Sequence, residues 1–549
     1  MNAIRIYLRD ENLWHRSGST YTRGYAYLGH RPASRKEFQT LISSQESFEG
    51  FLSLVKQLNG FFAVVHRIGE TLLVAEDRTR SFPLFYGSGK DGFYLSDDPR
   101  WVRDQVQDSD LDRLSVSEFL LAGYVAGSDT FYPHVKQVQA GEMLVIRRVD
   151  SRFACQTIRY FQYTHGNVVE KSTEELHALL DQILLRAFDR LVWFANGRTI
   201  VVSLSGGYDS RLIVLMLKRI GYENVLAYNY GRPRNAESQV SREVAKALGI
   251  RWEFVPYSNE AWSRWYRTEE YGRYRRFADG LVSIPHIQDW PAVWELTKQR
   301  ILPRDSVVVP GELAIGGMAR FPIVSSREIR MREDQLIQLI YNTDYILQDS
   351  SRQTMDTKSG IYGKIKTMLG GRSSYSLEGA ADAYERWWWQ ERAAKFLLNS
   401  VRVFEYWGYE WWAPLWDPEL IDFWSTVPLA HRFRKSLHKS YVRKLERRII
   451  GRNIREHRPL SAMPPMSFGV RALSRTSFFK YARRMVMLRE YDRHPLAWWG
   501  ILGKKEHRAL CTGVGDINSF LAVDTLRALT SKHGFGQSTI SHATLPSNR

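Results

Sequence analysis

Hydrophobic positions in the first 165 residues come in short runs that turn-forming residues interrupt. Runs of this length, rich in Phe, Val, Leu and Tyr, predict β-strands, and the candidates cover residues 61–65, 71–75, 82–86, 93–96 and 143–146. Two further stretches, 47–57 and 115–123, have the start signals and spacing of short helices. The pattern therefore predicts an α+β domain over residues 1–165, made mainly of short strands.

After residue 170 the pattern changes to strands that alternate with longer helices. Predicted helices cover 174–194 and 237–248, and predicted strands cover 199–203, 224–230, 251–255 and 306–309. This alternation is typical of a parallel sheet covered by helices on both faces, which binds ligands beyond the carboxyl ends of its strands. We predict an α/β parallel-sheet domain over 170–450, a helical C-terminal extension over 451–535 and a flexible polar tail over 536–549.

Tryptophan is concentrated in the helical region that follows residue 320. One interpretation is a wall on which a sugar or peptide stacks, and the commoner one is the packing of large helices. The residues concerned are Trp387, Trp388, Trp389, Trp407, Trp411, Trp412 and Trp416.

The composition is that of an ordinary globular protein, with 44% hydrophobic and 25% charged residues among 549. A chain of this length holds two or more domains. No apolar run reaches the roughly 18–20 residues that span a bilayer, and the N-terminus lacks the apolar core of a signal peptide. Cys155 and Cys511 are too few for a disulfide framework, and no Cys/His cluster has zinc spacing. We expect a cytoplasmic protein without a transmembrane segment.

The formal net charge of +18 is compatible with nucleic acid, an anionic membrane surface or an anionic small substrate as partner. The basic residues are spread along the chain and are densest over 432–448. No helix-turn-helix, RRM or KH signature is present, so we expect no nucleic-acid partner. A solvated basic surface and the steering of an anionic substrate are both open explanations, and a homodimer is compatible with the sequence.

The predicted strand at 199–203 runs directly into Ser205-Gly206-Gly207-Tyr208-Asp209-Ser210, where a helical pattern starts at once. Glycines let backbone N–H groups approach an anion, and the helix N-terminus adds partial positive charge. A carboxylate beside phosphates is explained by a bridging Mg²⁺, so Asp209 is the candidate metal ligand. The segment Gly87 to Gly92 has a superficial likeness to a Walker loop but lacks its leading glycine and final Ser/Thr, so it predicts a hairpin turn.

The pattern Ser-Gly-Gly-x-Asp-Ser resembles the pyrophosphate-binding loop of the N-type ATP pyrophosphatases, which release PPi and form adenylates. The resemblance implies ATP and Mg²⁺ as cofactors. It implies that PPi is held by Ser205, Gly206, Gly207, Asp209 and Ser210. Adenine would meet the backbone of two strand ends, at Ser203, Leu204, Tyr230 and Gly231.

The N-terminal domain resembles the glutaminase domain of asparagine synthetases, which implies an Ntn-hydrolase-like β-sandwich. The resemblance rests on Leu58-Asn-Gly60-Phe-Phe-Ala63, Asp77-Arg78, Pro83-Leu-Phe-Tyr86 and Tyr94-Leu-Ser96-Asp97. In that family the nucleophile is the cysteine exposed after removal of the initiator Met, activated by its own α-amino group. Because Asn2 stands there, we expect a silent scaffold that does not hydrolyse glutamine.

Residues 170–450 resemble the synthetase domain of the same family, and three residues are implied to be catalytic: Lys439, Glu312 and Arg443. Pro310-Gly311-Glu312 matches the start of the family's Ser-Gly-Glu-Gly-x-Asp-Glu segment, without its metal-binding Asp, and adds Gly311 to the binding residues. Lys439 and Arg443 match a Lys-x-x-Leu-Arg pattern, whose lysine can stabilise charge as PPi leaves. A surface carboxylate for Glu312 and a solvated helix residue for Lys439 stay open.

The resemblance implies an AMP- and PPi-forming amide synthetase that adenylates a carboxylate and transfers ammonia or a substrate amine. Trp412 replaces an arginine of the family's Arg-x-Pro-Phe-Leu-Asp segment, so aspartate is not the expected acid. Leu204 to Arg211 with Tyr230-Gly-Arg232 resembles the members tied to surface-polysaccharide synthesis, which implies amidation of a sugar uronic acid, an anionic substrate. The alternatives are an intramolecular cyclase of the lasso-peptide or β-lactam type and a non-catalytic ATP-binding scaffold.

Overall fold

The computed structural model describes residues 3–10, 13–150, 152–311, 321, 330–348, 354–456, 485, 488–510 and 516–530. The N-terminal part begins with strands and short helices in alternation. They are β1 (Ala3–Tyr7), β2 (Trp14–Ser17), β3 (Thr20–Leu28), β4 (Arg31–Pro32), α1 (Arg35–Ser43), α2 (Phe48–Gln57), β5 (Leu58–Ile68), β6 (Thr71–Glu76), β7 (Phe85–Gly89), β8 (Gly92–Ser96), α3 (Pro99–Val106), α4 (Arg113–Ala122), β9 (Lys136–Gln137), β10 (Glu142–Val149) and β11 (Arg152–Arg159).

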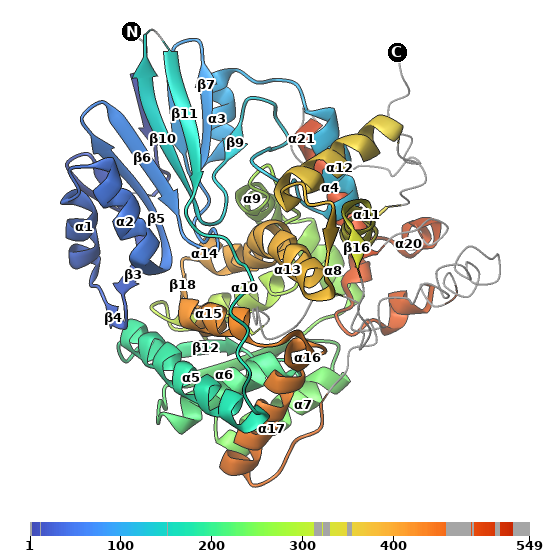
Figure 1. Cartoon of the computed structure of the whole chain (residues 1–549). Coiled ribbons are helices and arrows are strands. Elements are labelled where there is room, and N and C mark those ends of the chain that lie inside the picture. Colours follow the sequence, from blue (N-terminus) through green and yellow to red (C-terminus); the bar gives the residue numbers. More distant parts are fainter. Residues whose placement is uncertain are drawn as a thin grey trace.

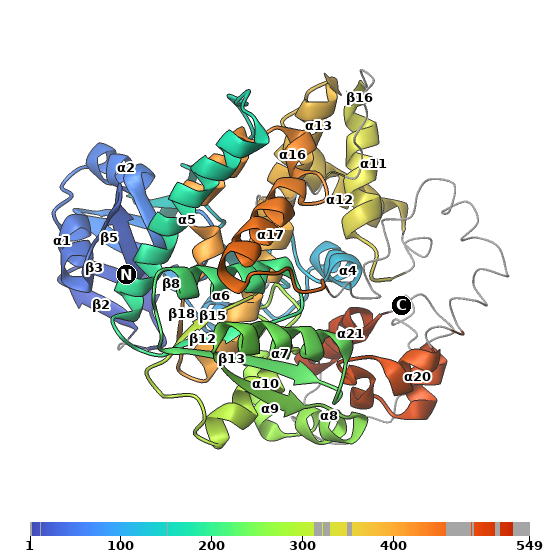
Figure 2. The ribbon, with the colours of Figure 1, turned by 90° about the horizontal axis from the view of Figure 1, so that it is seen from below.

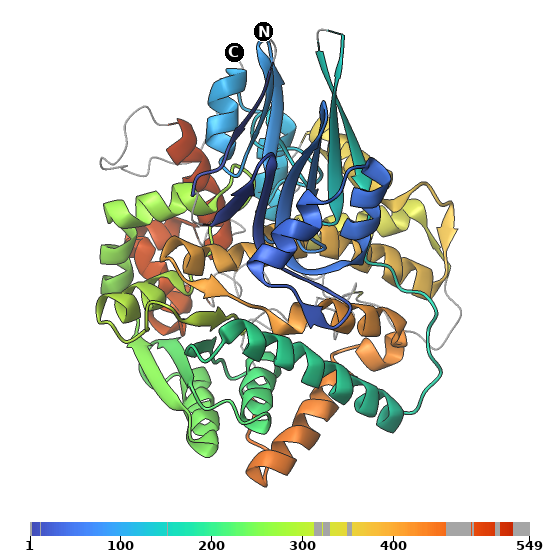
Figure 3. The same ribbon diagram turned by 90° about the vertical axis from the view of Figure 1, so that its left-hand side faces the viewer.

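These strands form two stacked sheets, which stand at the top of Figure 3. The larger has the order β11-β10-β6-β5-β3-β2 with β4 on β3, and the smaller has the order β1-β8-β7-β9. Alternate apolar side chains such as Val65, Val74 and Leu95 fill the space between the sheets. Helices α1 and α2 cover the outer face of the larger sheet, and α3 packs on β7 and β8 of the smaller one. The result is a layered α+β domain.

One predicted strand in this domain was misplaced. The interval 82–86 was expected to be extended, but β7 starts at Phe85. Pro83 has no N–H for a ladder, and the N–H of Leu84 is taken by the Glu76 carboxylate at 2.5 Å. The hairpin predicted at Gly87 to Gly92 is confirmed, because Gly89 pairs with Gly92 across a two-residue turn.

The second part contains the predicted parallel sheet. Its elements are α5 (Thr173–Ala195), β12 (Ile200–Ser203), α6 (Tyr208–Arg219), β13 (Val225–Gly231), α7 (Ala236–Leu248), β14 (Arg251–Pro256), α8 (Asn259–Tyr266), α9 (Glu269–Ala278), α10 (Trp290–Lys298), β15 (Val307–Val309) and β18 (Glu410–Trp411). The strand order is β14-β13-β12-β15-β18 and every pair is parallel. Strand β12 is apolar throughout its buried length because helices cover both faces. The carboxyl ends of β12, β13 and β15 meet at one edge of the sheet.

The remaining elements are mainly helical: β16 (Met331–Arg332), α11 (Glu333–Asp344), α12 (Met355–Leu369), β17 (Ser374–Tyr375), α13 (Leu377–Trp388), the π-helix η2 (Trp389–Leu397), η3 (Leu398–Val401), α14 (Arg402–Tyr406), η4 (Pro414–Trp416), α15 (Pro418–Thr426), α16 (Leu429–Arg432), α17 (Ser436–Ile450), η5 (Trp498–Ile501), α20 (Lys504–Leu510) and α21 (Ile517–Thr530). Helices α6, α7 and α17 lie on the side of the parallel sheet that faces away from the N-terminal sheets (Figures 1 and 2), and α5 also contacts β3, where the rings of Phe194 and Tyr25 have centroids 4.4 Å apart. None of the helices in the described ranges is long and apolar enough to cross a bilayer.

The tryptophans of the helical region are packing residues. Trp387, Trp389 and Trp416 are buried, and the last two lie ring to ring, with centroids 5.4 Å apart. Trp412 packs against Phe61 of the N-terminal domain, with ring centroids 5.2 Å apart. The helix-packing interpretation therefore accounts for these residues, and several of them join the two halves of the chain.

The spatial boundary between the two halves differs from the sequence boundary. Helix α4, which precedes residue 165, packs against α12 and α21 of the C-terminal part. Tyr124, just after α4, forms an isolated bridge with Ser283.

Residues 536–549, the predicted flexible tail, and Glu312 lie outside the described residues.

Candidate active site

The loop between β12 and α6 is closed by two serines. Ser210 Oγ accepts a hydrogen bond from the Ser205 N–H at 3.0 Å and lies 2.9 Å from Ser205 Oγ. Ser205 Oγ in turn accepts the N–H of Gly207 at 3.2 Å. Gly207 is the N-cap of α6 and has no side chain to cap the helix, so the first N–H groups of α6 stay available to an anion. Ser210 is buried and shapes the loop from inside.

Asp209, the predicted metal ligand, is held by two basic residues next to or on α17. Lys435 Nζ lies 2.5 Å from Asp209 Oδ2, and His438 Nε2 lies 2.9 Å from Asp209 Oδ1. Desolvation opposes the charge on Asp209, but the nearby Lys435 and His438 side chains outweigh it and lower the pKa of the carboxyl well below its usual value. Lys435 and His438 were not among the predicted site residues.

Lys439 and Arg443, both predicted to be catalytic, lie on the α17 face that meets the loop. Arg443 Nε donates to the Tyr208 hydroxyl at 2.7 Å, and Lys439 Nζ lies 5.9 Å from the centre of the Tyr208 ring. Lys439 also pairs with Glu456 at 3.6 Å. Helix α17 therefore brings a row of cations against the N-terminus of α6, although these residues are far from the loop in sequence. Whether Lys439 and Arg443 act in catalysis stays a prediction.

Gly311 brings the end of β15 directly against the loop. A Cβ atom on Gly311 would lie 2.2 Å from the Ser203 carbonyl oxygen and 2.8 Å from Ser210 Cβ. Only a glycine permits this approach, since contacts below 3.0 Å force the backbone to shift. The structure thus brings Gly311 together with the loop, as predicted for a residue of the site.

The two strand ends predicted to meet adenine are differently placed. Leu204 is buried, and its N–H and carbonyl bond to the Tyr228 carbonyl at 2.9 Å and to Asn229 Nδ2 at 2.8 Å. Ser203 is half-buried, and its hydroxyl donates to Asp289 at 3.4 Å. Tyr230 stacks on Tyr257 with centroids 5.1 Å apart. The adenine contacts of these residues stay predictions.

The C-terminal extension reaches the end of β13. Gly231 has a φ of +127°, and the Pro495 carbonyl oxygen lies 2.8 Å from the place where its Cβ would be. Arg232 donates its N–H to the same carbonyl at 2.6 Å and its Nε to the His494 carbonyl at 3.0 Å. Residues 494–495 therefore form one wall of the predicted adenine side, and no local pattern in the sequence indicates this contact.

A polar group centred on Asp289 lies beside Ser203. Asp289 accepts the Tyr228 hydroxyl at 3.3 Å and pairs with His286 at 3.2 Å. On α7, Glu237 is largely desolvated, which raises the pKa of its carboxyl, although a hydrogen bond with Asn229 opposes the shift. No local pattern marks Asp289 or His286 as site residues, because their role depends on how α10 docks on the sheet.

The residues present fit a nucleotide better than they fit an isolated metal ion. The described part of the chain holds no group of three or more His, Cys, Asp or Glu side chains that could bind a metal. Mg²⁺ is commonly held by one or two carboxylates together with substrate phosphates, and Asp209 supplies one such oxygen ligand. Asp209 would hold a Mg²⁺ that arrives with the phosphates and neutralises their charge, in exchange for its pairs with Lys435 and His438.

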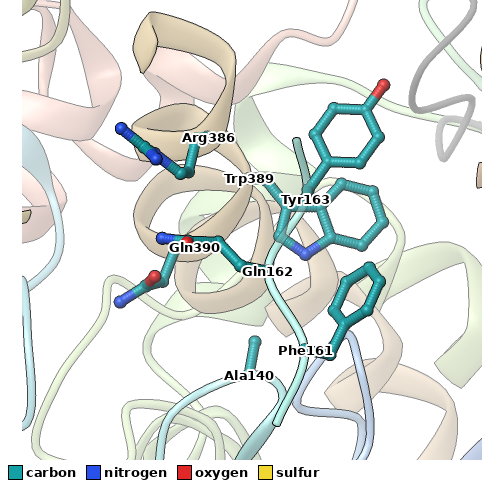
Figure 4. A pocket seen from close by; sticks show the side chains of 7 residues that line it. All are labelled: Ala140, Phe161, Gln162, Tyr163, Arg386, Trp389 and Gln390. Atoms are coloured by element: carbon teal, nitrogen blue, oxygen red, sulfur yellow. The ribbon is translucent and has the colours of Figure 1, made fainter. Parts of the chain in front are cut away.

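A separate small cavity lies between residues 161–163, which connect the two halves of the chain, and the helices α13 and η2 (Figure 4). Its seven lining residues include Phe161, Tyr163 and Trp389, and its volume is about 10 Å³. That volume holds about one water molecule. The cavity is therefore excluded as a nucleotide site and reflects imperfect packing around stacked aromatic rings.

Residues 412–417, which match the family's Arg-x-Pro-Phe-Leu-Asp segment, take part in the contact between the two halves of the chain. Asp417 forms a two-bond pair with Arg190, 2.7 Å for each bond, and accepts the Tyr27 hydroxyl at 3.0 Å. Because β18 is parallel to β15, Trp412 follows the carboxyl end of the sheet, and its N–H bonds to the Val308 carbonyl at 3.0 Å. Residues 412–417 therefore start at the edge of the sheet where the strands have their carboxyl ends. They end at Asp417, whose side chain is used in a structural contact with Arg190 and Tyr27.

Comparisons with known proteins match both halves of the chain. The glutamine amidotransferase domain family matches residues 25–160, and the family of the queuosine biosynthesis protein QueC, which are PP-loop ATP pyrophosphatases, matches residues 199–264. Asparagine synthetase [glutamine-hydrolyzing] 1 of Bacillus subtilis (strain 168) is 25% identical over 199 residues, which are 35% of this chain and 30% of that protein. The matched region is thus under a third of the relative's length.

Solved structures give only remote similarity. An NH3-dependent NAD synthetase from Campylobacter jejuni aligns with 26% of this chain and 58% of its own, at 14% identity and a TM-score of 0.17. The glutamine phosphoribosylpyrophosphate amidotransferase of B. subtilis aligns with 57% and 65%, at 12% identity and a TM-score of 0.19. The two domain matches and the curated relative support an asparagine synthetase-like family for this chain, in which a match to glutamine amidotransferase domains is followed by a match to PP-loop ATP pyrophosphatases.

Proposed function

We propose that the protein is an ATP-dependent amide synthetase. A substrate carboxylate oxygen attacks the α-phosphorus of ATP, the bond to the β-phosphate oxygen breaks, and an acyl-adenylate and PPi form. An amine then attacks the acyl carbon, AMP leaves, and the amine loses a proton. The carbon–nitrogen bond formed is an amide.

One observation carries this proposal: the loop at the end of β12 faces a row of cations on α17. The loop and the α6 N-terminus offer N–H donors, and Lys435, Lys439 and Arg443 add positive charge from the opposite side. Positive groups fixed on both sides of a polyphosphate stabilise the charge that develops on PPi as it leaves. In catalysis Lys439 and Arg443 would act on the phosphates, and Glu312 on the amine.

We expect the amine to be free ammonia or an amine of the substrate rather than ammonia from glutamine. Cys155 is the one cysteine in residues 1–165. It lies exposed on β11, where partial desolvation and the nearby Glu142 carboxylate raise the pKa of its thiol. A nucleophilic thiol needs the opposite shift, so this cysteine is a poor substitute for the family's nucleophile.

The acid is proposed to be an anionic carboxylate, with a sugar uronic acid of surface-polysaccharide synthesis as the favoured class. The net charge of +18 and the cations beside the loop suit a substrate that carries more than one negative charge. The intramolecular cyclase is the second choice, because nothing among the described contacts favours a peptide substrate over a sugar.

The test is ATP–PPi exchange with Mg²⁺ across a panel of uronic acids, nucleotide-linked uronic acids and amino acids, followed by amide detection with ammonium or glutamine as nitrogen source. The expected result is exchange that depends on one class of carboxylate, and amide formation with ammonium but not with glutamine. Tight ATP binding without exchange for any carboxylate would assign the protein to the ATP-binding scaffolds. Amide formation from glutamine alone would contradict the proposed nitrogen source.

A further inference from the structure

Arg211 is among the largest fully buried side chains of the molecule, with no part of it exposed. A guanidinium is strongly hydrated in water, so complete burial needs hydrogen bonds to almost all of its donors. Arg211 lies in the first turn of α6, next to Ser210. Its side chain extends toward α17, away from the site that the loop forms. Its contacts show what the burial accomplishes.

On one side, the Arg211 side chain forms a hydrogen bond with the loop itself. Its Nη2 donates to the Gly206 carbonyl at 3.2 Å. The other end of the same peptide group, the Gly207 N–H, is held by Ser205 Oγ at 3.2 Å. Both polar ends of the Gly206–Gly207 peptide are therefore fixed, and its carbonyl dipole is turned toward Arg211. If this peptide rotated, its carbonyl oxygen would face the anion and repel it.

On the other side, the Arg211 side chain forms an ion pair with α17 and hydrogen bonds with residues that follow this helix. Its Nη1 lies 3.2 Å from Glu446 Oε1 and donates to the Ile454 carbonyl at 2.9 Å, and its Nη2 also donates to the Arg455 carbonyl at 3.2 Å. Glu446 is as completely buried as Arg211. The same side chain thus joins the loop to the helix that carries Lys435, His438, Lys439 and Arg443.

We infer that Arg211 is a positioning residue for nucleotide binding, which acts by orienting the Gly206–Gly207 peptide and by setting the distance between the loop and α17. The inference rests on the proposed function, since it assumes that the loop binds the phosphates of ATP. Arg211 itself is shielded from the nucleotide by the loop. A lysine cannot replace it, because a single ammonium lacks the planar fork that reaches Gly206, Glu446 and the two carbonyls together.

The rival explanation is a buried ion pair that serves stability alone. The two explanations predict different results for a variant of Glu446 and a variant of Arg211. Glu446→Gln removes the ion pair but keeps an acceptor for Nη1 and leaves the bond to Gly206 intact. Arg211→Lys keeps a positive charge beside Glu446 but loses the bond to Gly206. A structural pair predicts equal harm from both, and a positioning role predicts harm from Arg211→Lys only.

The experiment measures equilibrium binding of Mg-ATP to the full chain, with thermal unfolding of every variant. Arg211→Lys should bind Mg-ATP at least tenfold more weakly than the unsubstituted protein, while Glu446→Gln stays within threefold. The double variant Arg211→Met/Glu446→Met removes both charges with similar volumes, so it should fold and yet show the same tenfold loss. A matched control, Arg219→Met, removes a two-bond pair from the other end of α6, leaves Asp181 as acceptor for the Tyr441 hydroxyl of α17, and should bind Mg-ATP normally.

Equal affinity of Arg211→Lys and the unsubstituted protein would overturn the inference, as would equal losses in Arg211→Lys and Glu446→Gln. If the double variant does not fold, the two single variants decide. Failure of the proposed function has a different signature, because the unsubstituted protein would then bind no Mg-ATP at all. With a turnover assay, the loss should appear in the KM for ATP and not in the KM for the acid, which a general loss of stability would not produce.

Discussion

Lys435 fastens α17 to the loop by placing its ammonium nitrogen 2.5 Å from Oδ2 of Asp209, a residue 226 positions earlier in the chain. The backbone bends sharply to allow this, since Arg434 and Lys435 both have left-handed φ values, +52° and +60°. Two consecutive non-glycine residues in this conformation cost free energy and persist where the surroundings enforce them, often at functional sites. The pair keeps Asp209 ionised and fixes α17 over the loop between β12 and α6.

The Lys435–Asp209 pair contributes to the stability of the ligand-free protein. Lys435→Met leaves a largely buried carboxylate with His438 as its remaining basic partner, and we expect the free energy of unfolding to fall by about 1–3 kcal/mol. Urea unfolding at pH 7.5 measures the change. Lys444→Met on the exposed side of α17 is the control and should change stability by less than about 0.5 kcal/mol; a smaller effect at Lys435 than at Lys444 would contradict the structural assignment.

Lys439 is expected to act on the leaving PPi. Lys439→Ala should lower the rate of ATP–PPi exchange by about 10²–10³-fold, because one charged donor to the developing oxyanion is lost. Its melting temperature should change little, since the ammonium is about a third exposed and its ion pair with Glu456 is long, at 3.6 Å. Exchange at the unsubstituted rate in Lys439→Ala would remove this residue from the catalytic set.

The contact of Gly311 with the loop predicts a steric effect. Gly311→Ala places a methyl carbon 2.2 Å from the Ser203 carbonyl oxygen, so β15 and the loop must separate. We expect Mg-ATP affinity to fall at least tenfold and unfolding to become easier by about 1–3 kcal/mol. Gly363→Ala on α12 is the matched control: nothing lies within 4 Å of its Cβ position, and alanine should stabilise this exposed helix by about 0.5–1 kcal/mol.

Acid should loosen the C-terminal segment that covers Gly231. Burial, together with the nearby Arg232, lowers the pKa of His494 from 6.5 to about 4. The neutral imidazole, whose Nδ1 accepts the Leu496 N–H at 3.2 Å, is therefore the folded form. Stability from this group is fully present above pH 6.5 and is lost as the pH falls from 6.5 toward 4, by at most about 3 kcal/mol.

The measurement for His494 is the free energy of urea unfolding from pH 7.5 to 4.5, compared between the unsubstituted protein and His494→Gln. Other groups titrate in this range, but they are common to both proteins, so the difference between the two curves isolates His494. The gap should change over pH 6.5–4.5. Parallel curves across the range would show that His494 is not buried as a neutral group.

Much of the fold follows from local pattern. The strands 61–65, 71–75, 199–203 and 251–255 were found because their apolar runs end at turn residues, and their elements appear in the structure with small changes at the ends. The exception at 82–86 arose because a proline and a side-chain carboxylate replaced the ladder bonds, and neither effect appears in hydrophobic periodicity.

The site divides in the same way. Ser205 to Ser210 could be predicted because strand, glycine turn and helix are adjacent in sequence, and Lys439 and Arg443 followed from a family pattern. Lys435, His438 and Asp289 could not, since ordinary basic and acidic residues become site residues only through the docking of α17 and α10 on the sheet.

By itself, the sequence determined that a glycine-containing loop joins a buried strand to a helix, because glycines, an apolar run and a helix start are all short-range signals. The tertiary structure alone decided what surrounds that loop. Arg211 joins the loop to α17 through Glu446, 235 positions away, and Pro495 closes the end of β13 from the far end of the chain. Such contacts depend on the angles at which whole helices pack, and these angles are set by the sum of many apolar contacts rather than by any local stretch of residues.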